Sequence, residues 1–209
     1  MFKEMTVDDF FDLLSSSSPT PGGGAASGIS GAQGIALTSM VASLTVGKKK
    51  YAEYNELNEK AIEKAAHLKD EFLALADEDA ESFDEMSKVL SMSKETEKDI
   101  LLRKEALQAA FKKCTLPPVK VMEISSEALK LTKSIVGKSN RSASSDLAVA
   151  ALNLKAASES AWVNVLVNLS YIEDEDFKRQ IIEKGRRLKE ENVALSLEIY
   201  DEVTKEFIK

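Results

Sequence analysis

The sequence predicts an all-α protein, and three features carry this prediction. Between Lys48 and Val136 the chain has no glycine, and its only prolines there are Pro117 and Pro118. Alanine, leucine, glutamate and lysine dominate the region, and these residues favour helices. No stretch alternates between apolar and polar residues as a strand would. We therefore expect a single bundle-like helical domain over residues 1–209, with about six to seven helices, several of them long.

Caps and breaks place these helices along the chain. Thr6 is a cap followed by two acids in a first turn, and Ser145 with Asp146 forms a second cap. Proline is tolerated only in the first turn of a helix, so the proline pair should open a new one. The predicted helices cover 6–14, 25–46, 52–90, 95–113, a segment opened by the proline pair, 147–169, and a last helix starting at 173–176.

Composition excludes several classes of protein. A net charge of -7 and a pI near 5.0 argue against nucleic acid as a partner, because a duplex binder needs a basic face. Cys114 is the only cysteine, so neither an internal disulfide nor a cysteine-rich metal site can form, which fits a reducing cytoplasm. The uncharged run at 25–46 is long enough to span a membrane but carries too many serines and threonines, so no membrane contact is expected.

The stretch from Pro19 to Tyr51 combines a Pro/Gly hinge, a small-residue helix and a cluster of three lysines. A helix that begins after Gly22, Gly23 and Gly24 presents free backbone N–H groups and a positive dipole end, which suits an anion. The alternative is a glycine turn that leads into a buried helix. The local pattern alone favours this simpler alternative.

One carboxylate interrupts an apolar stripe on the helix predicted at 52–90. The stripe has alternating three- and four-residue steps and consists of Ala61, Ala65, Leu68, Phe72, Ala76, Phe83, Met86 and Leu90. Asp79 completes the stripe between Ala76 and Phe83. Burial would raise the pKa of Asp79 and make it an acid or base near neutral pH. Alternatively, Asp79 pairs with a lysine or caps a neighbouring helix. Asp77 points the other way and should belong to a solvated face.

Amides line one face of the helix predicted at 147–169. Asp146, Asn153, Asn164 and Asn168 all fall within about 40° of one line at 100° per residue. Such amides could fix a polar ring or pair helices with each other. Both interpretations stay open from the pattern alone.

Four blocks in order make the chain resemble the cyclodeaminase/cyclohydrolase family of folate enzymes. They are Pro21 to Gly24, Gly47 to Tyr51, Asp77 to Phe83, and Ser145-Asp146 through Asn164-Val-Leu-Val-Asn168-Leu. Each block is modest alone, but together they cover nearly the whole chain. The chain departs from the family pattern at Ala25, Ser93 and Pro117, where serine, proline and valine are usual, and Ala25 removes a possible ligand hydroxyl.

The resemblance implies an all-helical domain that dimerises through a helical seam and acts on tetrahydrofolate one-carbon derivatives. It implies no metal and no cofactor beyond the folate substrate. Within the resemblance, Asp79 is the expected catalytic acid and base. The expected substrate-binding residues are Gly22, Gly23, Gly24, Lys48, Asn140, Asp146, Asn164 and Asn168. Lys48 to Lys50 and the free N–H groups after Gly24 are expected to hold the glutamyl carboxylates of a folate tail.

Two reactions and one non-enzymatic role remain as interpretations. We favour closure of 5-formimino-tetrahydrofolate to 5,10-methenyl-tetrahydrofolate with loss of ammonia. The alternative is a cyclohydrolase that converts the methenyl form to 10-formyl-tetrahydrofolate. A helical dimer or scaffold without catalysis is the third interpretation, which composition alone would favour.

Overall fold

The computed structural model describes residues 2–205 and 207, and these residues form six α-helices and three short 3-10 helices. The elements follow in the order η1 Phe2–Glu4, α1 Val7–Leu14, α2 Gly23–Ser43, η2 Lys49–Tyr54, α3 Asn55–Leu90, α4 Glu97–Ile135, η3 Arg141–Ala143, α5 Ser145–Leu169 and α6 Glu175–Thr204. No strand occurs among the described residues, so the predicted all-α fold is confirmed.

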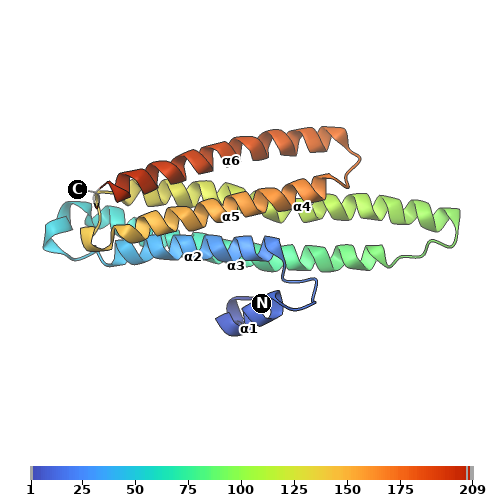
Figure 1. Cartoon of the computed structure of the whole chain (residues 1–209), viewed down its shortest axis with the longest axis horizontal. Coiled ribbons are helices and arrows are strands. Elements are labelled where there is room, and N and C mark those ends of the chain that lie inside the picture. The colour runs from blue at the N-terminus through green and yellow to red at the C-terminus, as the bar shows by residue number, and fades with distance from the viewer. Residues whose placement is uncertain (1, 206, 208–209) are drawn as a thin grey trace.

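Helices α2, α3, α4 and α5 pack as a bundle, and α6 lies along α4 and α5 (Figure 1). The small residues of α2 explain why this helix can be surrounded by neighbours. A Cβ atom on Gly31 would overlap the ring of Phe72, and one on Gly34 would lie 2.9 Å from the Leu154 side chain. Glycine therefore lets α3 and α5 approach the backbone of α2 closely.

Helix α1 lies outside this bundle, against α2 and α3 (Figure 1). Thr6 caps it as predicted, because its Oγ1 accepts a hydrogen bond from the Asp9 N–H at 3.1 Å. Phe2 and Phe10 are buried in a small apolar cluster there. The backbone N–H of Phe2 donates to Asp77 Oδ1 at 2.8 Å. The expectation that Asp77 is merely solvated is therefore wrong.

The proline pair lies inside α4 rather than at the start of a new helix, so the break predicted after Lys113 is wrong. In a regular helix the N–H at position 118 would bond the carbonyl of Cys114, and Pro118 has no N–H. The side-chain amide of Asn168 supplies that bond instead, at 2.8 Å. Pro117 and Pro118 are both buried, and packing on neighbouring helices holds α4 continuous through them.

The ends of α2 and α5 also differ slightly from the prediction. Helix α2 begins at Gly23 and takes Gly22 as its N-cap, so two of the three glycines are helical. Helix α5 begins at Ser145, and its N-cap is Ser144, which makes no side-chain cap bond. Asp146 lies in the first turn, where its charge is favourable to the helix dipole but does not cap the helix.

The tips of α3 and α4 project beyond the other helices as a two-helix hairpin (Figure 1). The predicted break after α3 is confirmed. No residue between Met86 and Cys114 is buried, and Leu90, the last member of the predicted stripe, is 44% exposed. The apolar stripe of α3 therefore leaves the core before the helix ends.

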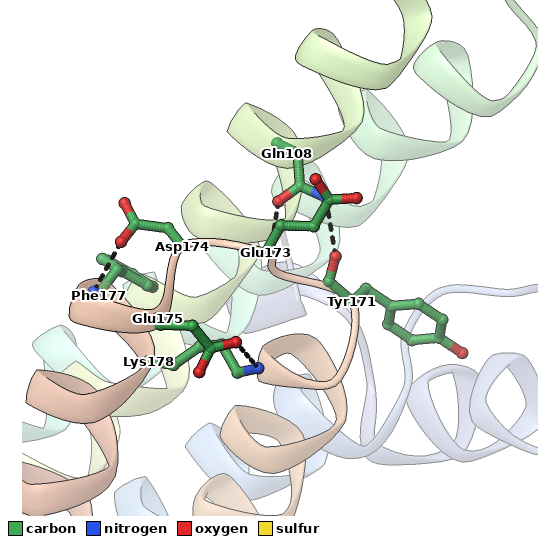
Figure 2. Close-up of polar contacts among 7 residues, drawn as sticks. All are labelled: Gln108, Tyr171, Glu173, Asp174, Glu175, Phe177 and Lys178. Carbon is green, nitrogen blue, oxygen red and sulfur yellow. Dashed lines mark hydrogen bonds and ion pairs between the residues drawn. The ribbon is translucent and has the colours of Figure 1, made fainter.

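Polar contacts from α4 fix the turn between α5 and α6 (Figure 2). The side chain of Gln108 donates to the Tyr171 carbonyl at 2.9 Å and accepts from the Glu173 N–H at 2.8 Å. Asp174 then caps α6 by accepting from the Phe177 N–H at 3.0 Å. These contacts fix the end of α5, which carries two of the predicted site residues.

Within residues 2–205 and 207, none of the helices combines the length and the apolar character that crossing a membrane requires.

Candidate functional site

A pocket of about 170 Å³ lies where the start of α2 meets α3, α4 and α5. It gathers the hinge before α2, the predicted acid, and two of the predicted amides. Its lining consists of Pro19, Thr20, Gly22, Gly23, Gly24, Asp79, Phe83, Cys114, Asn164 and Asn168. Residues from three of the four blocks in the sequence thus meet at one place.

Asp79 reaches from α3 to the first turn of α2. The backbone N–H of Ala25 donates a hydrogen bond to its carboxylate. Gly22 has no side chain to cap α2, so Asp79 acts as the capping group from a neighbouring helix. The anion predicted at the triple glycine is, in this structure, the protein's own carboxylate. The capping role weighed in the sequence for Asp79 is therefore present.

Two opposing effects set the pKa of Asp79. Burial removes water from the carboxylate and raises its pKa from 3.8 to about 6, while the Ala25 N–H favours the charged form and lowers it. The loss of hydration is the larger effect. Asp79 can therefore bind and release a proton close to neutral pH, as an acid/base group must.

Asn164 and Asn168 line the same pocket, and each donates one of its two amide N–H groups to a backbone carbonyl. The Nδ2 atom of Asn164 donates to the Ser160 carbonyl at 2.9 Å, and that of Asn168 donates to the Cys114 carbonyl at 2.8 Å. Each amide keeps its oxygen and one further N–H on its nitrogen. The pair can therefore both accept hydrogen bonds from a ligand and donate hydrogen bonds to it.

Asn153 is separate from this group. Its Nδ2 donates to the Val149 carbonyl at 3.0 Å, and its Cβ lies near Gly34, far along α5 from the pocket. The 100° rule placed Asn153 on the same line as the other two amides, but it could not show that only the last turns of α5 meet the pocket.

Cys114 also lines the pocket, although the sequence drew attention to it only as a single thiol. It is buried, and its thiol donates to the Ser82 carbonyl at 3.3 Å. Burial, with the nearby charge of Asp79 as a second cause, raises the pKa of Cys114 to about 11. It remains a neutral thiol at physiological pH. In the sequence, the only feature that connects Cys114 with the site is its position just before the proline pair. That position is informative only if α4 continues through the prolines.

Lys48, Asn140 and Asp146 lie at the opposite end of α2 from this pocket. The loop that contains Asn140 packs on the end of α2, because the Asn140 N–H donates to Thr45 Oγ1 at 2.7 Å. Helix α2 has 21 residues, so its two ends are about 30 Å apart at roughly 1.5 Å per residue. Within one chain, these residues and Asp79 cannot contact the same reacting atoms.

A second, larger hollow of about 460 Å³ occupies that end. It is lined by Lys50, Tyr51, Gly137, Ser139, Arg141 and Ser144. The Arg141 N–H donates to the Tyr51 hydroxyl at 3.0 Å, and this bond is the main cause that lowers the pKa of Tyr51. Neither Tyr51 nor Arg141 was predicted as a site residue. Tyr51 closes the lysine block and Arg141 follows Asn140, but nothing in the sequence brings these two segments together.

Comparisons with known proteins show the family of the chain. The family model described as formiminotransferase-cyclodeaminase matches residues 6–187. The methenyltetrahydrofolate cyclohydrolase of Methylorubrum extorquens is 36% identical, over 95% of this chain and 95% of that protein. The formimidoyltransferase-cyclodeaminase of Gallus gallus is 30% identical over 87% of this chain, which spans only 34% of that longer protein.

A solved structure has the same fold over its whole length. The formiminotetrahydrofolate cyclodeaminase of Thermotoga maritima superimposes with a TM-score of 0.84 at 28% identity, and the match covers 98% of this chain and 96% of that one. The family resemblance inferred from the four blocks is therefore confirmed. This chain belongs to the formiminotransferase-cyclodeaminase family.

Proposed function

We propose that this chain is a 5-formimino-tetrahydrofolate cyclodeaminase, which forms 5,10-methenyl-tetrahydrofolate and releases ammonia. The observation that carries the proposal is Asp79, a carboxyl with a pKa of about 6 in a pocket built from the hinge before α2 and the end of α5. The whole-length likeness to a cyclodeaminase structure supports it.

Ring closure needs one proton to leave and one to arrive. N10 attacks the carbon of the formimidoyl group, and the ionised Asp79 accepts the proton that N10 loses. Asp79 then returns this proton to the former formimidoyl nitrogen, and the bond from carbon to that nitrogen breaks to give ammonia. A single carboxyl whose pKa lies near neutrality can serve both steps in turn.

A methenyl-tetrahydrofolate cyclohydrolase is the second candidate. It is favoured by the 36% identity to the Methylorubrum cyclohydrolase over 95% of both chains. In that reaction Asp79 would take a proton from water as the water oxygen adds to the methenyl carbon. Asp79 would then return this proton to N5 as the bond from carbon to N5 breaks, and the added hydroxyl would lose its proton to solvent, which gives the 10-formyl product.

The decisive experiment supplies each substrate separately to the purified protein. Formation of the methenyl chromophore with stoichiometric ammonia from 5-formimino-tetrahydrofolate would support the proposal. Hydrolysis of 5,10-methenyl-tetrahydrofolate without turnover of the formimino substrate would replace it by the cyclohydrolase.

Substitution Asp79→Asn tests the assigned role in either case. General acid/base catalysis contributes about 10²- to 10⁴-fold, so turnover should fall by at least about 100-fold while folate binding persists. A rate near that of the wild type would exclude Asp79 as the acid/base group. If 5-formyl-tetrahydrofolate at saturation left the melting temperature unchanged, a non-enzymatic scaffold would be the better interpretation.

We further propose that the active form is a homodimer, in which the Asp79 pocket of one protomer lies next to the hollow lined by Lys50 and Arg141 of the other. The outer face of α5 is mostly apolar, apart from the partly exposed Lys155–Glu159 ion pair, and includes the exposed side chains of Val149, Leu152, Ala156, Val163 and Val167. Exposed apolar faces of this extent mark interaction surfaces. If two such faces met antiparallel about a two-fold axis, the Lys50 end of one protomer would approach the Asp79 pocket of its partner.

Such a dimer would place a cationic hollow next to the folate pocket. Lys50 and Arg141 line the hollow at the η2 end, together with Tyr51 and Ser139. Folate carries its carboxylates on the glutamyl tail, away from the pterin and the one-carbon unit. We therefore propose that the tail binds at this hollow of the partner protomer while the one-carbon unit lies beside Asp79.

A further inference from the structure

A small apolar cluster covers the place where the start of α2 packs on α3. Its buried members are two aromatic residues of the N-terminal segment and three alanines of these helices: Phe2, Phe10, Ala25, Ala76 and Ala80. The rings of Phe2 and Phe10 meet edge to face, with 5.6 Å between their centroids. Among the described residues, no member of the cluster comes from α4 or α5. The N-terminal segment, which lies outside the bundle, therefore supplies the bulk of this cluster (Figure 1).

The alanines of this cluster are neighbours of Asp79. The Ala25 N–H donates to the Asp79 carboxylate. On α3, Ala76 and Ala80 lie about 60° and about 100° around the helix from Asp79, on the same side, at roughly 100° per residue. The cluster thus buries the residue that holds the carboxylate in place, and it adjoins the carboxylate on α3 as well.

The alanines alone cannot keep water away from this hydrogen bond. Helices α2 and α3 approach closely because their facing residues are small: a Cβ atom on Gly28 would lie 2.7 Å from the Phe72 carbonyl oxygen and 3.0 Å from the Ala76 Cβ. Small side chains permit this approach but shield little of the backbone from solvent. Ala25 and Ala76 are nevertheless fully buried. The two aromatic rings therefore provide the shielding that the alanines lack.

Two polar contacts to α3 hold the N-terminal segment in this position. The Phe2 N–H donates to Asp77 Oδ1 at 2.8 Å, and the Thr20 hydroxyl donates to Asp84 Oδ1 at 3.4 Å. Phe2 precedes α1 and Thr20 follows it. The two acids lie on either side of Asp79 along α3. The segment is thereby attached, at both ends of α1, to the stretch of α3 that carries Asp79.

We infer that Phe2 and Phe10 are positioning residues for Asp79, because they exclude water from its hydrogen bond to the first turn of α2 and so hold the carboxylate in place for proton transfer. The inference rests on the proposed acid/base role of Asp79. Neither ring is among the described residues that line the pocket, so both act through Asp79 and do not touch the folate. Loss of hydration is the main cause that raises the pKa of Asp79, so removal of a ring should admit water and lower this pKa from about 6.

Removal of a ring changes no charge, so a lower pKa of Asp79 would report hydration. From α4, the titratable group that faces Asp79 is the Cys114 thiol, which is neutral at physiological pH. Helix α2 carries no charged side chain, and α5 faces the pocket with two uncharged amides. On α3, the adjacent acids are the partly buried Asp77 and the exposed Glu78. The charged residues of the N-terminal segment are all exposed, and they are Lys3, Glu4, Asp8, Asp9 and Asp12.

Carboxyl NMR of protein labelled with ¹³C-aspartate measures this pKa directly, and the Asp79 signal is identified by its absence in Asp79→Asn. Phe10→Ala should lower the pKa by at least about 0.5 pH unit, since it removes apolar cover. Phe11→Ala is the matched control, because Phe11 is the next residue of α1 but is 55% exposed and lies outside the cluster. It should leave the pKa of Asp79 unchanged. Phe10→Leu keeps much of the apolar bulk and should restore most of the wild-type value.

Phe2→Ala provides a second, independent variant. It removes the other ring and should lower the pKa of Asp79 in the same direction. The cluster is separate from the main core of the bundle, so α2 to α6 should stay folded in either variant. A thermodynamic cycle gives a further measurement: the stability that Asp79→Asn gains at pH 7 should shrink to less than about half in the Phe2→Ala or Phe10→Ala background.

In the active enzyme the same two variants should shift the pH profile. The value of kcat/KM depends on ionised Asp79, so its acid limb should move to lower pH by the amount that NMR finds for the pKa. A purely structural defect would instead lower kcat/KM by the same factor at every pH.

The possible outcomes separate this inference from the proposed function. A pKa of Asp79 that stays at its wild-type value, or rises, in both Phe2→Ala and Phe10→Ala would overturn the inference even in an active cyclodeaminase. An equal decrease in Phe11→Ala would overturn it too. A decrease confined to Phe2→Ala and Phe10→Ala would support it even if the wild-type protein failed to turn over the formimino substrate, and only the proposed reaction would then be lost.

Discussion

The carboxyl group of Asp79 occupies the space that a side chain on Gly24 would need. A Cβ atom at Gly24 would overlap the carboxyl carbon and both oxygens. Gly24 is helical and its φ is not positive, so backbone strain does not explain the glycine. Glycine is required there because the acid from α3 must reach the Ala25 N–H.

Gly24→Ala should therefore impair activity more than stability. The new methyl group displaces Asp79 from its hydrogen bond, and misplacement of a catalytic group by about 1 Å can cost about 100-fold in rate. Alanine in place of glycine favours the helix by up to about 1 kcal/mol, which partly offsets the collision. We expect kcat/KM to fall about 10- to 100-fold while the melting temperature changes little.

Gly23→Ala is the control for the Gly24→Ala variant. Its Cβ would lie 3.4 Å from Asn164 Nδ2, which is an ordinary contact, so its effect should be clearly smaller. Equal losses of kcat/KM in the two variants would contradict the specific conflict between Gly24 and Asp79.

The unfolding free energy should depend on pH as expected for a protein with a buried acid. The pKa of Asp79 is raised from 3.8 to about 6, so the folded protein binds a proton that the unfolded chain releases between these pH values. The stability contributed by this group is therefore greatest below pH 4, declines as pH rises to about 6, and stays low above it.

Asp79→Asn should consequently stabilise the protein at pH 7 while it abolishes turnover. A shift of this size corresponds to at most about 3 kcal/mol, and residual solvent contact reduces the expected gain to about 2 kcal/mol. Denaturant unfolding at pH 4 and pH 7 measures the effect, and the gain should shrink towards pH 4. A variant less stable than the wild type at pH 7 would mean that the cap on α2 outweighs the burial cost.

Asp77, two residues earlier on α3, should respond in the opposite way. Its carboxylate accepts the Phe2 N–H and so ties the N-terminal segment to the bundle. Asp77→Ala should cost about 1–2 kcal/mol of unfolding free energy and expose the segment before α2 to proteolysis. Glu78→Ala, at an exposed neighbour, should stay within about 0.5 kcal/mol of the wild type. Equal effects of the two substitutions would contradict this anchoring role.

The contrast between Asp77 and Asp79 shows how far the sequence could lead. Helical periodicity correctly separated the two acids, because the apolar stripe passes through position 79 and not through 77. Periodicity could not reveal that Asp77 binds the backbone N–H of Phe2, since that contact spans 75 residues. Local patterns predict which face of a helix is buried, but not which distant segment arrives to cover a polar position.

The proline pair illustrates a second limit. Local propensity places a helix break at Pro117 and Pro118, yet α4 continues because an amide from α5 replaces a missing backbone bond. A compensation between two helices leaves no trace in either helix alone. The same holds for the predicted ligands: Asp79 and Asn168 share a pocket, whereas Lys48 and Asn140 lie about 30 Å away along α2, at roughly 1.5 Å per residue.

The proposed tail site makes a prediction about Michaelis constants. The double variant Lys50→Ala with Arg141→Ala removes two cations from the hollow at the η2 end. Each charge-assisted hydrogen bond contributes about 1.5–3 kcal/mol, so the KM for a polyglutamylated substrate should rise at least about tenfold, with kcat little changed. The monoglutamate form should show a smaller rise. An unchanged KM for the polyglutamylated substrate would exclude the hollow as the tail site.

Mixing two defective proteins tests the proposed dimer. In the proposed dimer each site combines the Asp79 pocket of one protomer with the hollow lined by Lys50 and Arg141 of the other. A heterodimer of Asp79→Asn with the Lys50→Ala/Arg141→Ala variant therefore has one site in which both the pocket and the hollow are intact. At low polyglutamylated substrate, the mixed protein should therefore be several-fold more active than the two variants assayed separately. The control mixes Asp79→Asn with Asn168→Leu, which both damage the same end of the site, and it should show no gain. If subunit exchange is verified and the first mixture also shows no gain, each site is contained within one chain, and the tail must bind elsewhere on the same protomer as Asp79.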